Sequence, residues 1–171
     1  MQAYLKVNEP LAANIWLFRQ IGFYLDKQVL QSLPGFMDQK NVPAINVNLN
    51  LRTLVTSTFQ NFLRHSTPTK KLTFDVDVVD FMAHPEAFDY ALKMLHEKGC
   101  HLGLCGLTVH HIDYINFTKL AIDSLKFVWN SNFVNNLGKL KSVVETVGHE
   151  KIVLTKCDSE TADRKSTRLN S

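Results

Sequence analysis

Apolar residues recur along this chain with two alternating spacings. Intervals of three and four residues are typical of amphipathic helices, and short runs rich in β-branched and aromatic residues are typical of strands. Pro34, Gly99 and Gly148 are predicted to end helices. Helices are predicted over 14–33, 51–63, 85–99, 111–119 and 137–147. Strands are predicted over 44–49, 72–79, from 102–104 onward, over 121–128 and over 151–155.

Each predicted strand but the last is followed by a predicted helix. This order favours parallel strands joined by right-handed crossovers, in either a doubly wound sheet or part of a (β/α)8 barrel. A complete barrel needs about 250 residues, and the chain has 171. The sequence therefore predicts an α/β fold with about five parallel strands, and no internal repeat is visible.

The last nine residues, 163–171, lack apolar periodicity. One choice of codons for them resembles a sequencing-library adapter, so we interpret 163–171 as a non-native read-through tail and 1–162 as one partial domain. On this interpretation the natural chain continued beyond residue 162, and whether Met1 is its true start stays open. The tail carries three basic residues and one acidic residue, so without it the net charge falls from +3 to +1. This near-neutral balance argues against a nucleic-acid polymer as partner.

The rest of the composition is that of a globular protein, with 45% hydrophobic residues. No apolar run reaches the length of about 18 residues that a membrane span needs, and the first residues do not resemble a signal peptide. We expect a cytoplasmic protein without a membrane segment in this chain. The three cysteines match no zinc pattern and are expected to be free thiols: Cys100, Cys105 and Cys157.

Two polar stretches end the first two predicted strands. Asn48-Leu49-Asn50, followed by Arg52 and Leu54, resembles the N-hydrophobic-S and R-x-L pattern of the EAL domain family. Asp75-Val76-Asp77-Val78 resembles that family's E-I-T-E strand end, with Asp75 in place of the first glutamate and Val78 in place of the second. The E-A-L tripeptide itself has no counterpart in this chain.

Three later strands extend the resemblance over residues 14–162. Cys105-Gly106-Leu107-Thr108 stands where the family has D-D-F-G, so both aspartates are missing. Lys126-Phe127-Val128 resembles K-I-D without its aspartate. Leu154-Thr155-Lys156-Cys157-Asp158 resembles A-E-G-V-E, with Thr155 in place of a metal-binding glutamate and Asp158 in place of the second one.

The resemblance implies a (β/α)8 barrel that hydrolyses cyclic di-GMP with two Mg²⁺ or Mn²⁺ ions at the carboxyl ends of its strands. It also implies a vestigial site of Asn48, Asp75, Lys126 and Asp158, with Asn48 and Asp75 as the remaining metal-ligand positions. Two-metal hydrolysis needs several hard oxygen ligands. We therefore expect no catalytic residue and no bound metal cofactor.

Three functions follow as hypotheses. The first is a catalytically inactive EAL-like module in bacterial cyclic di-GMP signalling, which binds a partner protein or dimerises. The second is a metal-independent cyclic di-GMP receptor that uses Arg52 and Lys126 to bind phosphate. The third, which the missing acids oppose, is an active phosphodiesterase. Cys105 near His110 and His111 is interpreted as a core thiol beside a surface loop rather than as a nucleophile.

Overall fold

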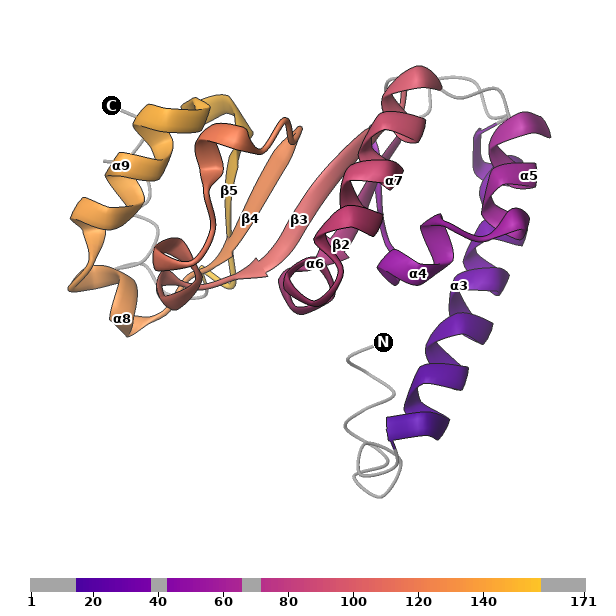
Figure 1. The fold of residues 1–171 in the computed structure, drawn as a ribbon, viewed down its shortest axis with the longest axis horizontal. Coiled ribbons are helices and arrows are strands. Elements are labelled where there is room, and N and C mark those ends of the chain that lie inside the picture. Colours follow the sequence, from indigo (N-terminus) through magenta and orange to yellow (C-terminus); the bar gives the residue numbers. More distant parts are fainter. Residues whose placement is uncertain (1–14, 38–42, 66–71, 158–171) are drawn as a thin grey trace.

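The computed structural model describes residues 15–37, 43–65 and 72–157. Their strands form one parallel sheet in the order β1-β2-β3-β4-β5 (Figure 1). The strands are β1 (Ile45–Asn48), β2 (Leu72–Asp77), β3 (His101–Leu107), β4 (Ser124–Val128) and β5 (Ile152–Thr155). The α-helices are α3 (Ile15–Met37), α4 (Leu51–Leu54), α5 (Ser57–His65), α6 (Val78–Ala83), α7 (Pro85–Glu97), α8 (Ser131–Val134) and α9 (Leu137–Val147). The 3₁₀ helices are η1 (Val109–Asp113), η2 (Phe117–Lys119) and η3 (His149–Lys151). The predicted fold is confirmed: five parallel strands with interspersed helices form part of a (β/α)8 barrel.

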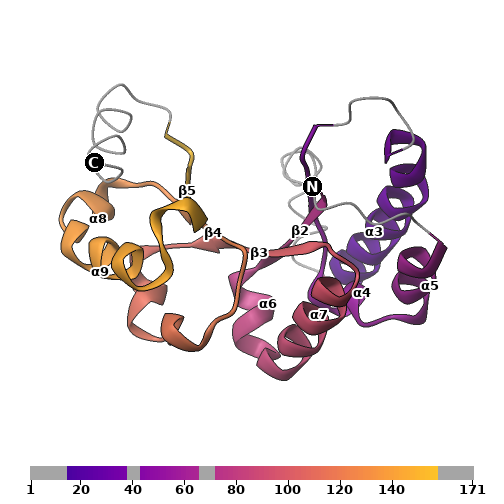
Figure 2. The same ribbon diagram turned by 90° about the horizontal axis from the view of Figure 1, so that it is seen from above.

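The sheet is curved, and the helices cover its outer side (Figure 2). Alternate residues of the inner strands point into this helical layer and are almost fully buried, including Phe74, Leu102, Leu104, Leu125 and Phe127. The register aligns them in rows, because Phe74 pairs with Leu102 and Leu104 pairs with Leu125. Burial of each such side chain contributes roughly 1.5–3 kcal/mol, so these rows fix which face of every strand points away from the helices.

Helix α3 does not end where the sequence predicted. Pro34 was expected to stop it, but the helix continues through Pro34 to Met37. A proline in a helix lacks the N–H that would bond to the carbonyl four residues earlier. Leu30 and Leu33 are buried in the core, and their packing holds the last turn in place despite that loss.

Three further elements differ from the sequence prediction. The helix expected over 51–63 is divided into α4 and α5, and the one expected over 111–119 is two 3₁₀ helices. The strand expected to reach Val79 ends at Asp77, because the Asp77 carboxylate accepts a hydrogen bond from the Val79 N–H (2.8 Å) and starts α6. The helix ends predicted at Gly99 and Gly148 are confirmed, and both glycines have positive φ.

Asp26 ties α3 to the segment that follows β1. This buried carboxylate accepts hydrogen bonds from the Asn50 N–H (3.0 Å), the Asn50 side-chain amide (2.7 Å) and the Thr53 hydroxyl. Those donors sit at the start of α4, directly after the strand that ends with Asn48. Asp26 therefore sets the position of the first polar loop at the carboxyl end of the sheet. Among the described residues, no helix is both long and apolar enough to cross a membrane.

The first prediction concerns this tie. Asp26→Ala removes one acceptor that serves three donors, and we expect the free energy of unfolding in urea to fall by about 2–3 kcal/mol. Asp89→Ala, at an exposed position of α7, serves as the control and is expected to change it by less than about 0.5 kcal/mol. Equal losses in both variants would contradict the role given to Asp26.

Candidate functional site

One row of side chains crosses four strands on the inner face of the sheet. Asn48 pairs in register with Asp75, Asp75 with Gly103, and Gly103 with Ser124. Paired residues of neighbouring strands point to the same face, and the residues next to them in sequence point into the helical layer. The row therefore faces the inside of the barrel, and it runs from the carboxyl end of β1 to the first residue of β4.

Asp75 and Lys126 form a buried ion pair in this row. Lys126 lies two residues beyond Ser124 on β4, and its ammonium donates a hydrogen bond to Asp75 Oδ2. The side chain of Asp75 is 2% exposed and that of Lys126 is 13% exposed. Burial raises the pKa of Asp75, and the hydrogen bond and positive charge of Lys126 oppose that rise without cancelling it. The carboxylate is thus neutralised from within the protein.

Gly103 leaves the space that the polar groups of the row occupy. A Cβ atom at this position would lie 2.2 Å from Asp75 Oδ1 and 2.6 Å from Ser124 Oγ, so no larger residue fits without displacing one of them. These two oxygens are also the buried side-chain atoms in the described part of the chain that have no hydrogen-bond partner. The site accordingly keeps one carboxylate oxygen and one hydroxyl that are buried and have no hydrogen-bond partner in the described part of the chain.

The next positions of β3 that were singled out, Cys105 and Gly106, carry no hard oxygen ligand on their side chains. Cys105 pairs with Asp77, and its thiol pKa is raised to about 11, first by burial and then by the negative charges of Asp77 and Asp75. A thiol with that pKa stays protonated at neutral pH, which opposes a nucleophilic role. His111 is engaged elsewhere, since its Nδ1 accepts the Thr108 N–H (2.9 Å).

The other residues singled out from the sequence do not join this pair. Arg52, on α4, is exposed and its Nη2 donates to His84 Nε2 (3.2 Å). The Thr155 hydroxyl donates to the carbonyl of Phe127 (3.1 Å). Asn48 shares the register row but its side chain is exposed. Asp158 lies outside the described residues.

The described residues do not form a two-metal centre. Within the described ranges, no three His, Cys, Asp or Glu side chains stand where they could hold a metal ion. Asp75 already has a cationic partner, and the Asp77 carboxylate caps α6. Mg²⁺ and Mn²⁺ require several oxygen ligands, and a fixed ammonium beside the remaining carboxylate repels a dication.

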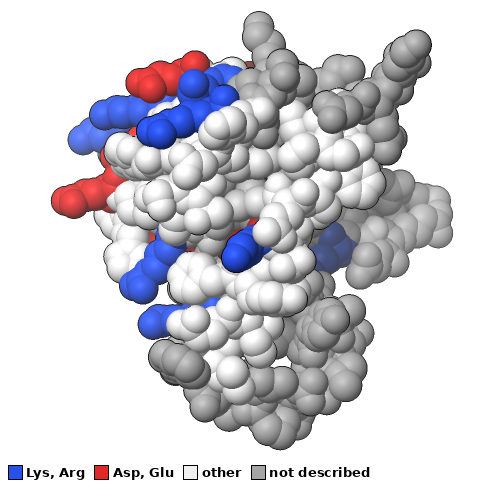
Figure 3. Space-filling view, turned by 90° about the vertical axis from the view of Figure 1, so that its right-hand side faces the viewer, with Lys and Arg blue, Asp and Glu red and all other residues white. Residues whose placement is uncertain are grey.

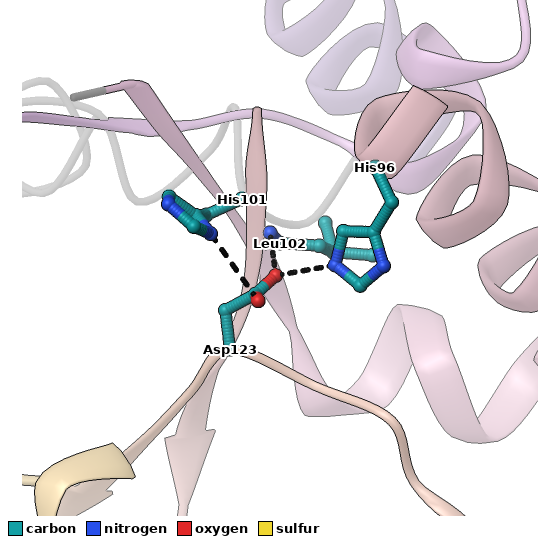
Figure 4. Close-up of polar contacts among 4 residues, drawn as sticks. All are labelled: His96, His101, Leu102 and Asp123. Carbon is teal, nitrogen blue, oxygen red and sulfur yellow. Dashed lines mark hydrogen bonds and ion pairs between the residues drawn. The ribbon is translucent and has the colours of Figure 1, made fainter. Parts of the chain in front are cut away.

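A second polar cluster lies at the amino ends of β3 and β4 (Figure 4). Asp123, just before β4, accepts hydrogen bonds from His96 Nε2 (2.8 Å) and from the Leu102 N–H (2.8 Å), and His101 Nδ1 lies 3.2 Å from its other oxygen. Burial alone would raise the pKa of Asp123, but the bonds from Leu102, His96 and His101 outweigh it and hold the pKa below its usual value. The cluster joins α7, β3 and β4. Sequence reasoning missed it, because nothing in the spacing of these residues indicates that they meet.

The sequence matches the model of the EAL domain family over residues 10–145. The chain belongs to the EAL domain family. Among solved structures it is similar to the EAL domain of FimX from Xanthomonas citri in complex with c-diGMP, with 11% identity and a TM-score of 0.63, covering 90% of this chain and 63% of that one. It is also similar to the PaMucR phosphodiesterase in its c-di-GMP complex, with 21% identity and a TM-score of 0.64, covering 96% and 77%.

A third similar structure is the S helix-GGDEF-EAL part of Vibrio cholerae LapD, with 13% identity and a TM-score of 0.62. The match covers 88% of this chain but only 39% of that one, so the chain spans less than two thirds of the FimX and LapD chains. At these identities the likeness shows the fold alone. No protein with a curated description matches the sequence.

The buried pair of this EAL domain gives a second prediction. Lys126→Met leaves Asp75 buried without its cation, and Asp75→Asn leaves the ammonium without its anion, so each should lower the free energy of unfolding by about 3–5 kcal/mol. The double variant should lose much less than the sum of the two, because it leaves no uncompensated charge.

The matched control is the exposed pair of Lys139 and Asp113. The cycle of Lys139→Met and Asp113→Asn should show a coupling below about 1 kcal/mol. Urea unfolding of all variants measures both cycles. Additive losses at Asp75 and Lys126 would contradict a coupled pair.

The third prediction concerns pH. The folded pKa of Asp123 lies below its unfolded value of about 3.9, so the ionised carboxylate stabilises the fold above that pH, and this stabilisation is lost as pH falls through the folded pKa. We expect Asp123→Asn to lower the free energy of unfolding by about 1–2 kcal/mol at pH 6–7. The difference should shrink below about pH 4, whereas Asp113→Asn, at an exposed site, should show little difference at any pH. A difference that stays constant down to pH 3 would exclude the carboxylate as its cause.

Proposed function

We propose that this EAL domain is a catalytically inactive regulatory module of bacterial cyclic di-GMP signalling, which acts in the cytoplasm by binding a partner protein or a second copy of itself. One observation carries the proposal: among the described residues, no three His, Cys, Asp or Glu side chains converge to hold a metal ion, and the buried Asp75 carboxylate is paired with Lys126. Hydrolysis of a phosphodiester by two metals requires cations that stabilise both the attacking and the leaving oxygen. The described part of this site offers one carboxylate and an ammonium in place of that charge, so we expect no metal cofactor.

The adjacent positions support the same conclusion. Cys105 and Gly106 supply no carboxylate, and Thr155 points its hydroxyl at a backbone carbonyl. Ser124 and Asn48 supply neutral oxygens at most. The barrel scaffold is retained while the negative charge that metal catalysis needs is not, which suits a domain that works through its surface.

A second candidate function is a metal-independent receptor for cyclic di-GMP. The similar structures of FimX and PaMucR are described as complexes with this nucleotide. Lys126 and the exposed Arg52 are the residues that we expect to contact its phosphates. The Lys126–Asp75 pair opposes this role, because binding a phosphate would compete with an existing buried carboxylate.

The fourth prediction separates these functions. In a hydrolysis assay with cyclic di-GMP and either Mg²⁺ or Mn²⁺, we expect no product above a protein-free control. An active EAL phosphodiesterase run in parallel confirms that the assay works. Metal-dependent hydrolysis by this chain would overturn the proposal.

Calorimetric titration of cyclic di-GMP, with Mg²⁺ and then with a chelator, tests the receptor. Heat that survives the chelator and is lost in Arg52→Ala would establish a metal-independent receptor. Lys139→Ala, at an exposed position remote in sequence from the row, is the matched control. No heat in either buffer would leave protein interaction as the function.

A further inference from the structure

Helices α3 and α5 enclose a groove of about 330 Å³ on the outer side of the sheet. Its lining is mostly apolar at the floor and polar at the rim, and it is separate from the row that holds Asp75 and Lys126. The lining residues are Lys27, Leu30, Gln31 and Pro34 from α3, and Thr58, Asn61, Phe62 and His65 from α5. On α3 these positions follow the i, i+3, i+4, i+7 spacing of a single helix face.

The floor of the groove is fixed before anything binds. Leu30 is 4% exposed and belongs to the core. The ring of Phe62 packs against Phe59 (centroids 5.9 Å apart) and edge-on against Phe74 (6.5 Å). Because Phe59 and Phe74 are fully buried, Phe62 is held in place and does not need to be ordered by a ligand. Preformed apolar sites lose less entropy on binding.

The lining of the groove carries a positive charge and no negative one. Lys27 lines it from α3, and no carboxylate is part of the lining. No salt bridge in the described ranges involves Lys27 or Arg64. Arg64 and His65 lie in the last turn of α5, where cations favour the helix dipole, but Lys27 lies within α3 and has no such role.

The surface around the groove also shows few acidic groups. Figure 3 shows the molecule from the side on which α3 and α5 lie: the surface is mainly white with separate blue groups, and its red groups lie mainly toward the left edge. The one acid of α3, Asp26, is buried in its bonds to Asn50 and Thr53 and adds little negative charge to this surface. Tyr24, three residues before Lys27, is 62% exposed and extends the apolar surface by one turn.

We propose that the α3–α5 groove binds an amphipathic helix of a partner protein, with apolar residues in the groove and Asp or Glu facing Lys27. The segment from Lys27 to Pro34 is about 10 Å long, which fits two turns of a docked helix with anchors at i, i+3 or i+4, and i+7. A nucleotide suits the groove less well, because phosphates need several converging donors and Lys27 is the only lining group with a permanent positive charge. This inference rests on the proposed role in protein interaction and names the surface and the chemistry of the partner.

The test uses three labelled peptides of about 14 residues, four helical turns, and the full chain in fluorescence anisotropy at low salt. The first has Leu at anchor spacing and Glu on its polar face, the second has Lys in place of Glu, and the third has Ser in place of Leu. We expect the first to bind about tenfold more tightly than either of the others, since complementary charge and apolar anchors are both needed.

Two variants place the binding in the groove. Lys27→Glu should weaken binding of the Glu peptide about tenfold, and Thr58→Trp, at an exposed lining position, should abolish it by filling the groove. Lys93→Glu, on the exposed face of α7, is the charge-matched control and should change nothing. Both lining positions are exposed, so thermal unfolding should show an intact fold in every variant.

Binding of the Glu and Lys peptides with equal affinity, or binding that neither groove variant changes, would overturn the proposal. Sedimentation of the chain alone distinguishes the other occupant: a dimer that Lys27→Glu dissociates would assign the groove to a second copy and would also overturn it. Neither result bears on the hydrolysis assay, so the groove can fail while the inactive regulatory role stands.

Discussion

A lysine ammonium bonded to a buried carboxylate determines how the inner face of this half-barrel is organised. Asp75 can be 2% exposed only because Lys126 supplies a charge and a donor at the same point. The pair spans from β2 to β4 and therefore passes over β3, which is possible because the intervening residue, Gly103, has no side chain. The contact thus depends on the strand order, on the register of β2, β3 and β4, and on the absence of a Cβ atom at Gly103.

That contact separates the architecture of the EAL domain from the activity that the family resemblance implies. The helical layer and its apolar rows follow the barrel pattern without any need for metal. The inner face, in contrast, carries an internally balanced ion pair, a thiol with a raised pKa and a glycine. A scaffold with these two properties presents stable surfaces, and the α3–α5 groove is one of them.

The spacing of apolar residues predicted the sheet and most of its helices, because each helix or strand buries the face on which those residues recur. It failed where a single tertiary contact decides the outcome: Asp77 ends β2 by capping α6, and core packing of Leu33 carries α3 past Pro34. Asp75 and Lys126 were both singled out through the family resemblance, but their mutual contact was not, since two α-helices, a strand and two 3₁₀ helices separate them in sequence. The bonds of Asp123 to His96 and His101, and the groove, depend on elements that meet only in the folded chain.

The backbone at Gly106 restricts which side chains this position of β3 can hold. Gly106 has a φ of +76°, and a Cβ atom there would lie 2.9 Å from the Asp77 carboxylate. An aspartate introduced by mutation at this position would meet an unfavourable backbone conformation, a steric conflict and a like charge at once. An acidic side chain at Gly106 therefore requires Asp77 and the start of α6 to change as well, so no single substitution can place a carboxylate at this point of β3 without disturbing the next helix.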